Sequence, residues 1–395
     1  MLFGSNRTYI YLDNAATTPL CDAAAEAMAP YMKAAPDGTF GNANSLHSIG
    51  REAFSELEDA RTRVARALGA QRPDEIVFTS GATEADNAAI VGMALAERDR
   101  RRLRGNAASG RVVMSRIEHH AVLHSAAMLK RLGFEVDFVD NDASGHIGVE
   151  ALERVMREDT VLVSIMAVNN EVGTVLDTAA LAEAAHRHGA LFHADAVQAL
   201  GKIPFNVGAL GVDAASFSSH KVGGPQGVGV MYLKTRTPFV AYMAGGGQER
   251  GMRSGTQNIA GILGCAAAVE HAVAFQPAFA ERAAKLRDSL YQELCSLPKV
   301  SATVRLESGE FAPHIVNVCV SGMESQTMIL QLDLRGFCVS GGSACSSNSL
   351  DPSHVLSALG VKRNLAQGSL RISFGEITDE ADVASFVEAF KEVVS

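Results

Sequence analysis

Short apolar runs alternate with helix-like stretches through the first two-thirds of this 395-residue chain. The helix-like stretches, at residues 84–104, 120–132, 149–157 and 178–188, separate runs that have the length and composition of β-strands. Strands that alternate with helices form parallel βαβ units, and helices then cover both faces of the sheet. The sequence therefore predicts a large α/β domain with a seven-stranded sheet, at residues 76–79, 112–114, 136–139, 161–167, 190–194, 214–217 and 228–233.

The pattern changes after residue 256, where a long helical stretch at 259–297 leads away from the alternating region. The last third predicts a smaller α+β domain with strands at 314–320 and 369–374 and helices at 325–334 and 379–394. We place the large domain at residues 15–260 and the small domain at residues 1–14 together with 261–395. A hydrophobic content of 47% is enough for both cores.

The overall charge limits the partners that the chain is expected to have. The formal net charge of −9 argues against binding to nucleic acid or to an anionic membrane surface. Residues 1–10 lack the apolar segment of a secretory signal, and no run of about 18 uninterrupted apolar residues suggests a membrane span. We therefore expect a cytoplasmic protein.

The six cysteines are scattered, without a CxxC pair or a zinc-type spacing. We expect free thiols, and we interpret Cys21, Cys265, Cys295 and Cys319 as buried packing residues. Histidines at 120 and 124 have the i,i+4 spacing of a metal-ligating pair. No carboxylate or thiol partner is evident in the sequence, so we expect surface histidines and no metal.

Lys221 and Asp195 are the most informative polar residues. Lys221 lies in a turn rich in Ser, His, Gly and Pro that follows a predicted strand, and Asp195 follows the strand at 190–194. Ligands of open α/β sheets bind beyond the carboxyl ends of the strands. A lysine that forms a Schiff base and a carboxylate that pairs with a pyridine nitrogen are what pyridoxal 5′-phosphate (PLP) requires. The two residues together therefore suggest a PLP site.

Other residues have two readings when taken singly. Thr83, in Ser80-Gly81-Ala82-Thr83-Glu84, opens a helix whose N-terminus can bind a phosphate, or it is an ordinary helix cap. Arg371 grips a substrate carboxylate, or it pairs with a surface acid. Cys345 follows a Ser- and Gly-rich stretch that suggests a thiol on a flexible loop.

Together these residues resemble the cysteine desulfurases of the fold-type-I PLP superfamily, in the group that serves iron–sulfur cluster assembly. The resemblance extends from Tyr11 past Arg371 and covers nearly the whole chain. It implies a PLP-dependent transferase with a mixed, mostly parallel sheet, which acts as a homodimer. Its motifs occur in family order, at residues 11–18, 80–84, 118–119, 168–171, 195 with 198, 220–221, 253–256 and 342–345.

The resemblance implies how these residues hold the PLP ring. Lys221 would form the Schiff base, Asp195 would contact the pyridine nitrogen, and His119 would stack on the ring. Gln198 and Asn170 would lie near the 3-hydroxyl of the cofactor.

The resemblance also implies the phosphate contacts. Ala82 and Thr83 would contribute from the helix start, and Ser218 and His220 from the turn before the lysine. Thr256 would reach across from the second subunit of the homodimer.

The implied reaction converts L-cysteine to L-alanine. Arg371 and Asn170 would hold the substrate carboxylate while Lys221 removes the α-proton. A thiolate at Cys345 would attack the substrate sulfur and carry it as a persulfide to an iron–sulfur scaffold or another acceptor protein. Cys345 is also a candidate transient ligand of a cluster formed with such a scaffold.

Two alternatives with the same fold stay open at this point. A selenocysteine lyase would use the same residues on a selenium substrate. An aminotransferase would use the same cofactor, and Cys345 would then be incidental. A non-enzymatic regulatory or scaffold role fits poorly, because every reacting group is present.

Overall fold

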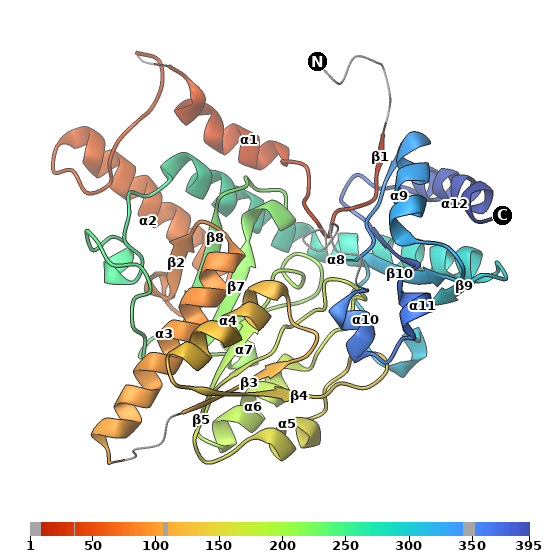
Figure 1. The fold of residues 1–395 in the computed structure, drawn as a ribbon. Coiled ribbons are helices and arrows are strands. Elements are labelled where there is room, and N and C mark those ends of the chain that lie inside the picture. The colour runs from red at the N-terminus through yellow and green to blue at the C-terminus, as the bar shows by residue number, and fades with distance from the viewer. Residues whose placement is uncertain (1–8, 35, 106–109, 343–351) are drawn as a thin grey trace.

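A seven-stranded sheet forms the centre of the larger part of the protein (Figure 1). The computed structural model describes residues 9–34, 36–105, 110–342 and 352–395. The strand order is β2-β8-β7-β6-β5-β3-β4, and all neighbours are parallel except β8, which pairs antiparallel with β2 and with β7. This confirms the predicted mixed, mostly parallel sheet. The strands are β2 (Ile76–Thr79), β3 (Arg111–Ser115), β4 (Glu135–Val139), β5 (Thr160–Ser164), β6 (Leu191–Asp195), β7 (Ala214–Ser218) and β8 (Gly229–Leu233).

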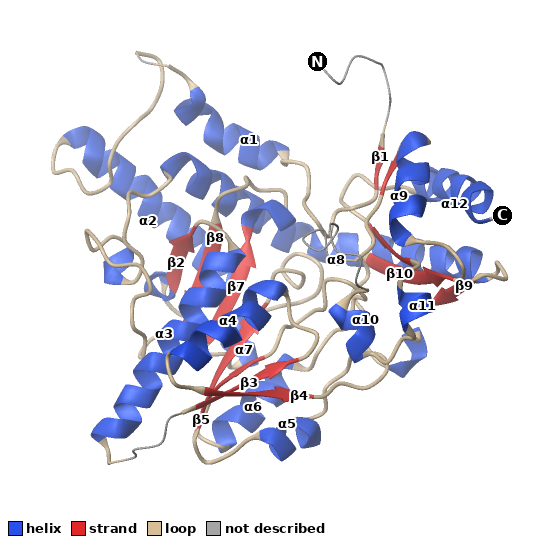
Figure 2. Cartoon of the chain, in the orientation of Figure 1, coloured by secondary structure: helices blue, strands red, loops and turns tan. Residues whose placement is uncertain are grey.

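Helices cover both faces of this sheet, as the alternating pattern predicts (Figure 2). In β2, Ile76 and Phe78 enter one core and Val77 enters the other, because successive side chains of a strand point to opposite faces. The first core contains residues of α2 (Ser48–Leu68), α5 (Val149–Val155), α6 (Thr178–Arg187) and α7 (Val207–Leu210), and the second contains residues of α3 (Ala82–Leu103) and α4 (His120–Arg131).

A smaller unit lies beside the sheet domain, on the right in Figure 1. Its central strand β10 (Ile315–Val320) pairs antiparallel with β9 (Val300–Ala302) and β12 (Ser369–Ser373). The short strand β1 (Ile10–Tyr11) pairs with β11 (Phe337–Cys338), so residues 10–11 lie beside this unit. Its helices are α9 (Ser325–Leu334) and α12 (Glu380–Val394), whereas the buried side chains of α10 (His354–Ala358) and α11 (Arg363–Ala366) belong to the first core.

The long helix α8 (Ile259–Cys295) connects the two units, and its first part packs against α1 (Asp22–Met28) and α2. Its residues from Ile259 to Val269 belong to the first core, and those from Phe279 to Leu294 belong to the core of the smaller unit. The two cores therefore meet inside α8, and a domain boundary at residue 260 stays a prediction. By length and composition α8 is apolar enough to span a membrane, but 56% of its apolar 18-residue window is buried in the protein, as in a core helix.

The cysteines partly follow the expectation of buried packing. Cys265 and Cys319 are buried, and Cys21 is half-buried. The prediction is wrong for Cys295, which is exposed at the end of α8. Leu294 in the same last turn is still buried, so Cys295 lies on the face of α8 that points away from the core.

Candidate active site

A cavity of about 420 Å³ lies at the carboxyl ends of the parallel strands. The chain reaches it from the ends of β2, β3, β5, β6 and β7, where predicted functional residues follow the strands. This is the edge at which open α/β sheets bind ligands. The predicted residues that line the cavity are Ala82, Thr83, His119, Asn170, Asp195, Gln198, Ser218, His220, Lys221 and Arg371.

Lys221 and Asp195 are held in this cavity by backbone groups. Lys221 ends a short 3-10 helix after β7, and its Nζ donates to the carbonyl oxygens of Ala15 (2.7 Å) and Ala16 (2.6 Å). Asp195 ends β6, and its Oδ1 accepts a hydrogen bond from the Val197 N–H at 3.0 Å. Burial raises the pKa of Asp195 to about 6, although that N–H and the charge of Lys221 both lower it. One pocket therefore presents an amine and a carboxylate.

Two histidines line the cavity in their neutral form. His119 caps the start of α4, where its Nδ1 accepts from the Ala121 N–H at 3.2 Å, so its proton lies on Nε2. Burial, followed by the charge of Lys221, lowers the pKa of His119 to about 4. The same two causes lower the pKa of His220 to about 4, and its Nδ1 lies 3.0 Å from Thr17 Oγ1. Both rings are uncharged near pH 7.

The N-terminus of α3 forms another wall of the cavity, at residues 80–84. The first N–H groups of a helix have no partner inside the helix, and the helix dipole favours an anion there. Strand β8 passes close to this turn at Gly229, where an added Cβ would lie only 2.4 Å from the carbonyl carbon of Gly81. The glycine therefore lets the strand and the helix start approach each other, and the cavity gains an end suited to an anion.

Arg371 reaches the cavity from β12 of the smaller unit and is 1% exposed. Its Nη1 donates to the carbonyl oxygen of Asn170 at 2.8 Å, and its Nη2 to Asp13 Oδ1 at 2.8 Å. Its Nε has no hydrogen-bond partner in the described part of the chain. The sequence left two roles open for Arg371, binding of a substrate carboxylate or pairing with an acid. The structure combines them, because Arg371 pairs with Asp13 and also lines the cavity. Gln198 is also held, with its Oε1 3.1 Å from His314 Nε2.

Of the predicted residues that the structure describes, Thr256 does not line this cavity. Thr256 is exposed, so its contact with a phosphate in a second subunit stays a prediction. Cys345 lies outside the described residues, and its role also stays a prediction.

Two buried acids beside the cavity were missed in the sequence. Asp86 lines the cavity from α3 and is 1% exposed, and Glu118, which precedes His119, is fully buried. Burial raises the pKa of both, that of Glu118 to about 8. A signal for Asp86 was available, because this acid lies one turn before Ala89 and Ile90 and therefore on the apolar face of the helix.

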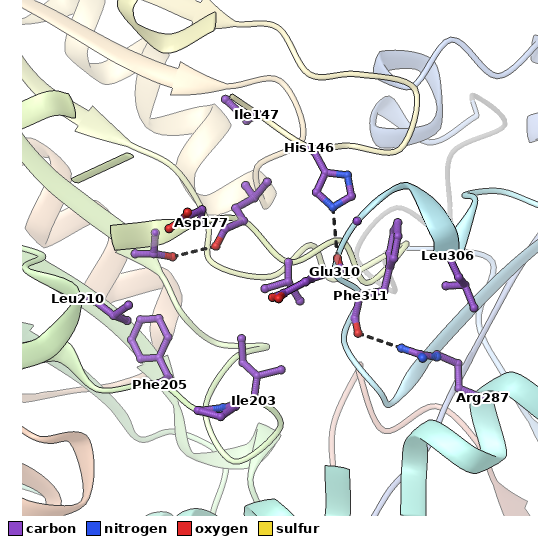
Figure 3. A pocket seen from close by; sticks show the side chains of 15 residues that line it. His146, Ile147, Asp177, Ile203, Phe205, Leu210, Arg287, Leu306, Glu310 and Phe311 are labelled. Carbon is purple, nitrogen blue, oxygen red and sulfur yellow. Dashed lines mark hydrogen bonds between the residues drawn. The ribbon is translucent and has the colours of Figure 1, made fainter. Parts of the chain in front are cut away.

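A larger cavity, of about 890 Å³, lies away from these residues (Figure 3). Its charged groups stabilise the fold. Arg287 Nη1 donates to the carbonyl oxygen of Phe311 at 2.9 Å, and Asp177 caps α6 by accepting from the Ala180 N–H at 3.0 Å. The described residues that line it include no lysine and none of the predicted site residues, so the smaller cavity is the candidate active site.

Comparisons with known proteins cover nearly the entire chain. A family model for aminotransferase class-V matches residues 10–386. The cysteine desulfurase IscS of Dictyoglomus turgidum is 41% identical over 387 residues, which cover 98% of this chain and 94% of that protein. A solved structure of a NifS-like protein has a TM-score of 0.88 at 38% identity, and the match covers 98% of this chain and 99% of that one. A structure of SspA in complex with cysteine has a TM-score of 0.78 at 33% identity, with 93% and 99% covered.

Proposed function

The chain belongs to the class-V aminotransferase family and, within it, to the cysteine desulfurases, and we propose that it converts L-cysteine to L-alanine and passes the sulfur through Cys345 to acceptors for iron–sulfur cluster assembly. The observation that carries this proposal is the cavity in which Lys221, Asp195 and Arg371 meet. Their amine, carboxylate and guanidinium groups suit a PLP cofactor and an amino-acid substrate. The near-full-length likeness to a cysteine desulfurase supports cysteine as that amino acid.

The residues that line the cavity fit PLP. A volume of about 420 Å³ lies within the range of small-molecule sites, roughly 300–1,000 Å³. Asp195, buried and charged beside Lys221, would face the pyridine nitrogen, Lys221 would hold the aldehyde carbon, and the start of α3 with Thr83 would hold the phosphate. When bound, PLP supplies an electron-withdrawing ring that stabilises negative charge at the substrate α-carbon.

The side chains of the cavity have distinct tasks in this proposal. Lys221 Nζ moves the proton of the substrate α-carbon. His119 is neutral, carries its proton on Nε2 and covers one wall of the pocket. Arg371 orients the substrate carboxylate, because its Nε hydrogen has no partner among the described residues. Because its other two nitrogens are fixed by Asp13 and Asn170, little side-chain motion is lost when the substrate binds.

The sulfur step is proposed from the sequence, since Cys345 lies outside the described residues. Its thiolate attacks the substrate sulfur, and an S–S bond forms at Cys345 Sγ. The Cβ–S bond breaks, and its electron pair stays on Cβ, which takes up a proton and leaves as the methyl group of alanine. A free cysteine has a pKa of about 8.5, so the site must favour the thiolate. An acceptor thiol then takes the outer sulfur and restores Cys345.

We also propose that two copies of the chain form a homodimer. Phe40, Leu46 and Phe54, on and just before α2, are large apolar side chains that are 63%, 89% and 52% exposed. A concentration of such side chains on a surface favours a protein partner. Thr256 is exposed and does not line the cavity of its own subunit, which supports a contact with the cavity of the second subunit.

The proposal is tested by mixing the purified protein with L-cysteine in the absence of reductant. We expect alanine in proportion to the protein, together with one additional sulfur atom on the Cys345 peptide in the mass spectrum. Alanine with an unmodified Cys345 would indicate direct release of sulfur, and the persulfide step would be wrong. Formation of no alanine would overturn the proposed reaction. A Cys345→Ser protein is the control, because it keeps the visible cofactor band and forms no persulfide at this position.

A further inference from the structure

One acid in the cavity has no task in the proposed reaction. Asp86 is the fifth residue of α3, is 1% exposed and lines the cavity. Neither of its carboxyl oxygens makes a hydrogen bond of normal length and angle to a described residue, although the Ser216 hydroxyl lies close enough to favour the charged form. Burial of a charged carboxylate without a partner is strongly unfavourable, whereas a protonated acid is tolerated far better. The surroundings of Asp86 therefore decide which form it takes.

A second acid lies next to it. An oxygen of Asp86, an oxygen of Asp195 and a ring nitrogen of His119 all lie within 4.8 Å of one another. Two carboxyl groups this close in a buried site resist being charged together, so the pair retains one proton. Asp195 is the better anion, because it accepts the Val197 N–H and faces the charge of Lys221. Burial, followed by the charge of Asp195, raises the pKa of Asp86 well above its usual value.

The other groups around Asp86 do not supply a positive charge. His193 Nε2 lies 3.6 Å from Asp86 Oδ1, but burial lowers the pKa of His193 to about 3 and the ring is neutral. Its two nitrogens lie 2.9 Å from the hydroxyls of Ser164 and Ser216. The Ser216 hydroxyl lowers the pKa of Asp86, but by less than burial and the charge of Asp195 raise it. Any charge on Glu118 raises the pKa of Asp86 further.

We propose that Asp86 is a positioning residue that stays protonated at neutral pH and thereby keeps Asp195 charged at the end of the site where the pyridine nitrogen binds. The O–H dipole of a neutral acid stabilises a neighbouring carboxylate, whereas a second carboxylate would repel it. Asp86 thus acts through Asp195 and does not touch the substrate. The inference rests on the proposed cofactor, and it concerns the charge at the ring nitrogen that the proposed reaction requires.

The proton on Asp86 is tested by infrared difference spectroscopy of the purified protein against Asp86→Asn at pH 7. We expect the difference to contain the C=O band of a protonated carboxyl group, with a shift in heavy water. Glu118→Gln is the matched control, because it removes the other buried acid and leaves the Asp86 band in place. Loss of a carboxylate band in Asp86→Asn would overturn the proposal. The band does not depend on turnover, so it still reports on Asp86 if the proposed reaction fails.

The effect on Asp195 is tested by pH titration of the visible cofactor band in the holoenzyme. Asp86→Asn keeps a neutral polar group, so its midpoint should lie within about 0.3 unit of the original. Asp86→Leu removes the dipole, and its midpoint should move by about one unit. An unmoved midpoint in Asp86→Leu, or a shift of a full unit in Asp86→Asn, would overturn the proposal. Should the leucine variant fail to fold, the asparagine variant and the infrared band still decide.

Discussion

Glu249 and Asp86 are both buried acids of the large sheet domain, yet their surroundings differ. Glu249 is 4% exposed and accepts hydrogen bonds from Arg61 Nη1 (2.7 Å), Arg61 Nη2 (2.9 Å) and the Phe78 N–H (2.9 Å). Asp86 is the one buried acid in the described ranges whose two oxygens both lack a hydrogen-bond partner of normal length and angle. Buried polar groups in native proteins are normally hydrogen-bonded. Glu249 therefore has the full set of partners of a structural ion pair, whereas Asp86 has the incomplete set that is typical of a residue in a binding cavity.

The first prediction concerns the cavity and has the largest expected effect. Lys221→Ala should lose the visible cofactor band and at least about a thousandfold of alanine formation, because the described lining offers no other lysine amine. Its unfolding free energy should change by no more than about 1 kcal/mol. Absorption spectra, alanine assays and urea unfolding measure these quantities. Lys285→Ala is the control, since that side chain is 70% exposed. An unchanged visible band in Lys221→Ala would contradict the assignment.

The second prediction concerns the buried ion pair between Glu249 and Arg61. Glu249→Ala leaves the Arg61 guanidinium buried at 2% exposure with its bidentate partner removed. We expect a loss of about 3–5 kcal/mol in unfolding free energy, measured by urea unfolding. Glu281→Ala removes an exposed acid that pairs with Lys285 and should leave stability nearly unchanged. Equal losses in the two variants would mean that the buried pair contributes no more than a surface pair.

The third prediction concerns the substrate end of the cavity. Arg371→Ala should raise KM for cysteine and lower kcat/KM by about 10²-fold, while the visible cofactor band remains. Arg371→Lys should recover little, because an ammonium group does not reproduce the planar fork. Steady-state kinetics with cysteamine, which lacks the carboxylate, provide the control. With this compound Arg371→Ala and the original protein should differ little. A similar loss with cysteamine would show that Arg371 supports the fold instead of the substrate.

Much of the fold could be predicted from the sequence because buried parallel strands are continuous apolar runs. Strand β2 and helix α9 have the predicted bounds. Helix α2 was missed, although it has 21 residues. Its buried positions, such as Leu57, Val64 and Leu68, are separated by charged residues, so no apolar run marks it. A helix that contributes one face to the core shows only this spaced pattern.

The site could be predicted in part for a related reason. Lys221 and Asp195 follow strands, and the ends of parallel strands meet at one edge. The contact between Arg371 and Asp13 joins residues 358 positions apart, and the bridge of Asp13 with Ser373, at the end of β12, brings them together. Asp86 and His193 meet by the packing of α3 on the sheet, with 3.6 Å between His193 Nε2 and Asp86 Oδ1. Such contacts depend on how elements are placed, which no local pattern encodes.

The last prediction, with the smallest expected effect, compares buried acids through the pH dependence of stability. Burial raises the pKa of Glu118 from 4.5 to about 8, so the native state keeps a proton that the unfolded chain releases between these values. The stabilisation that this proton contributes to the original protein should therefore be lost as pH rises through that window, by at most about 1.4 kcal/mol per pH unit.

Glu118→Gln has no such proton, so its stability relative to the original protein should increase from about pH 5 to about pH 8 in urea unfolding. Asp86→Asn should show the same sign, because burial also raises the pKa of Asp86. Glu281→Gln is the control and should show no trend in this window, since the exposed partner Lys285 lowers the pKa of Glu281. Parallel curves for all the variants would mean that both buried acids are charged in the native protein. Burial beside Asp195 would then not suffice to keep Asp86 protonated. The difference between Asp86 and Glu249 would lie only in how their side chains pack, and not in their charge.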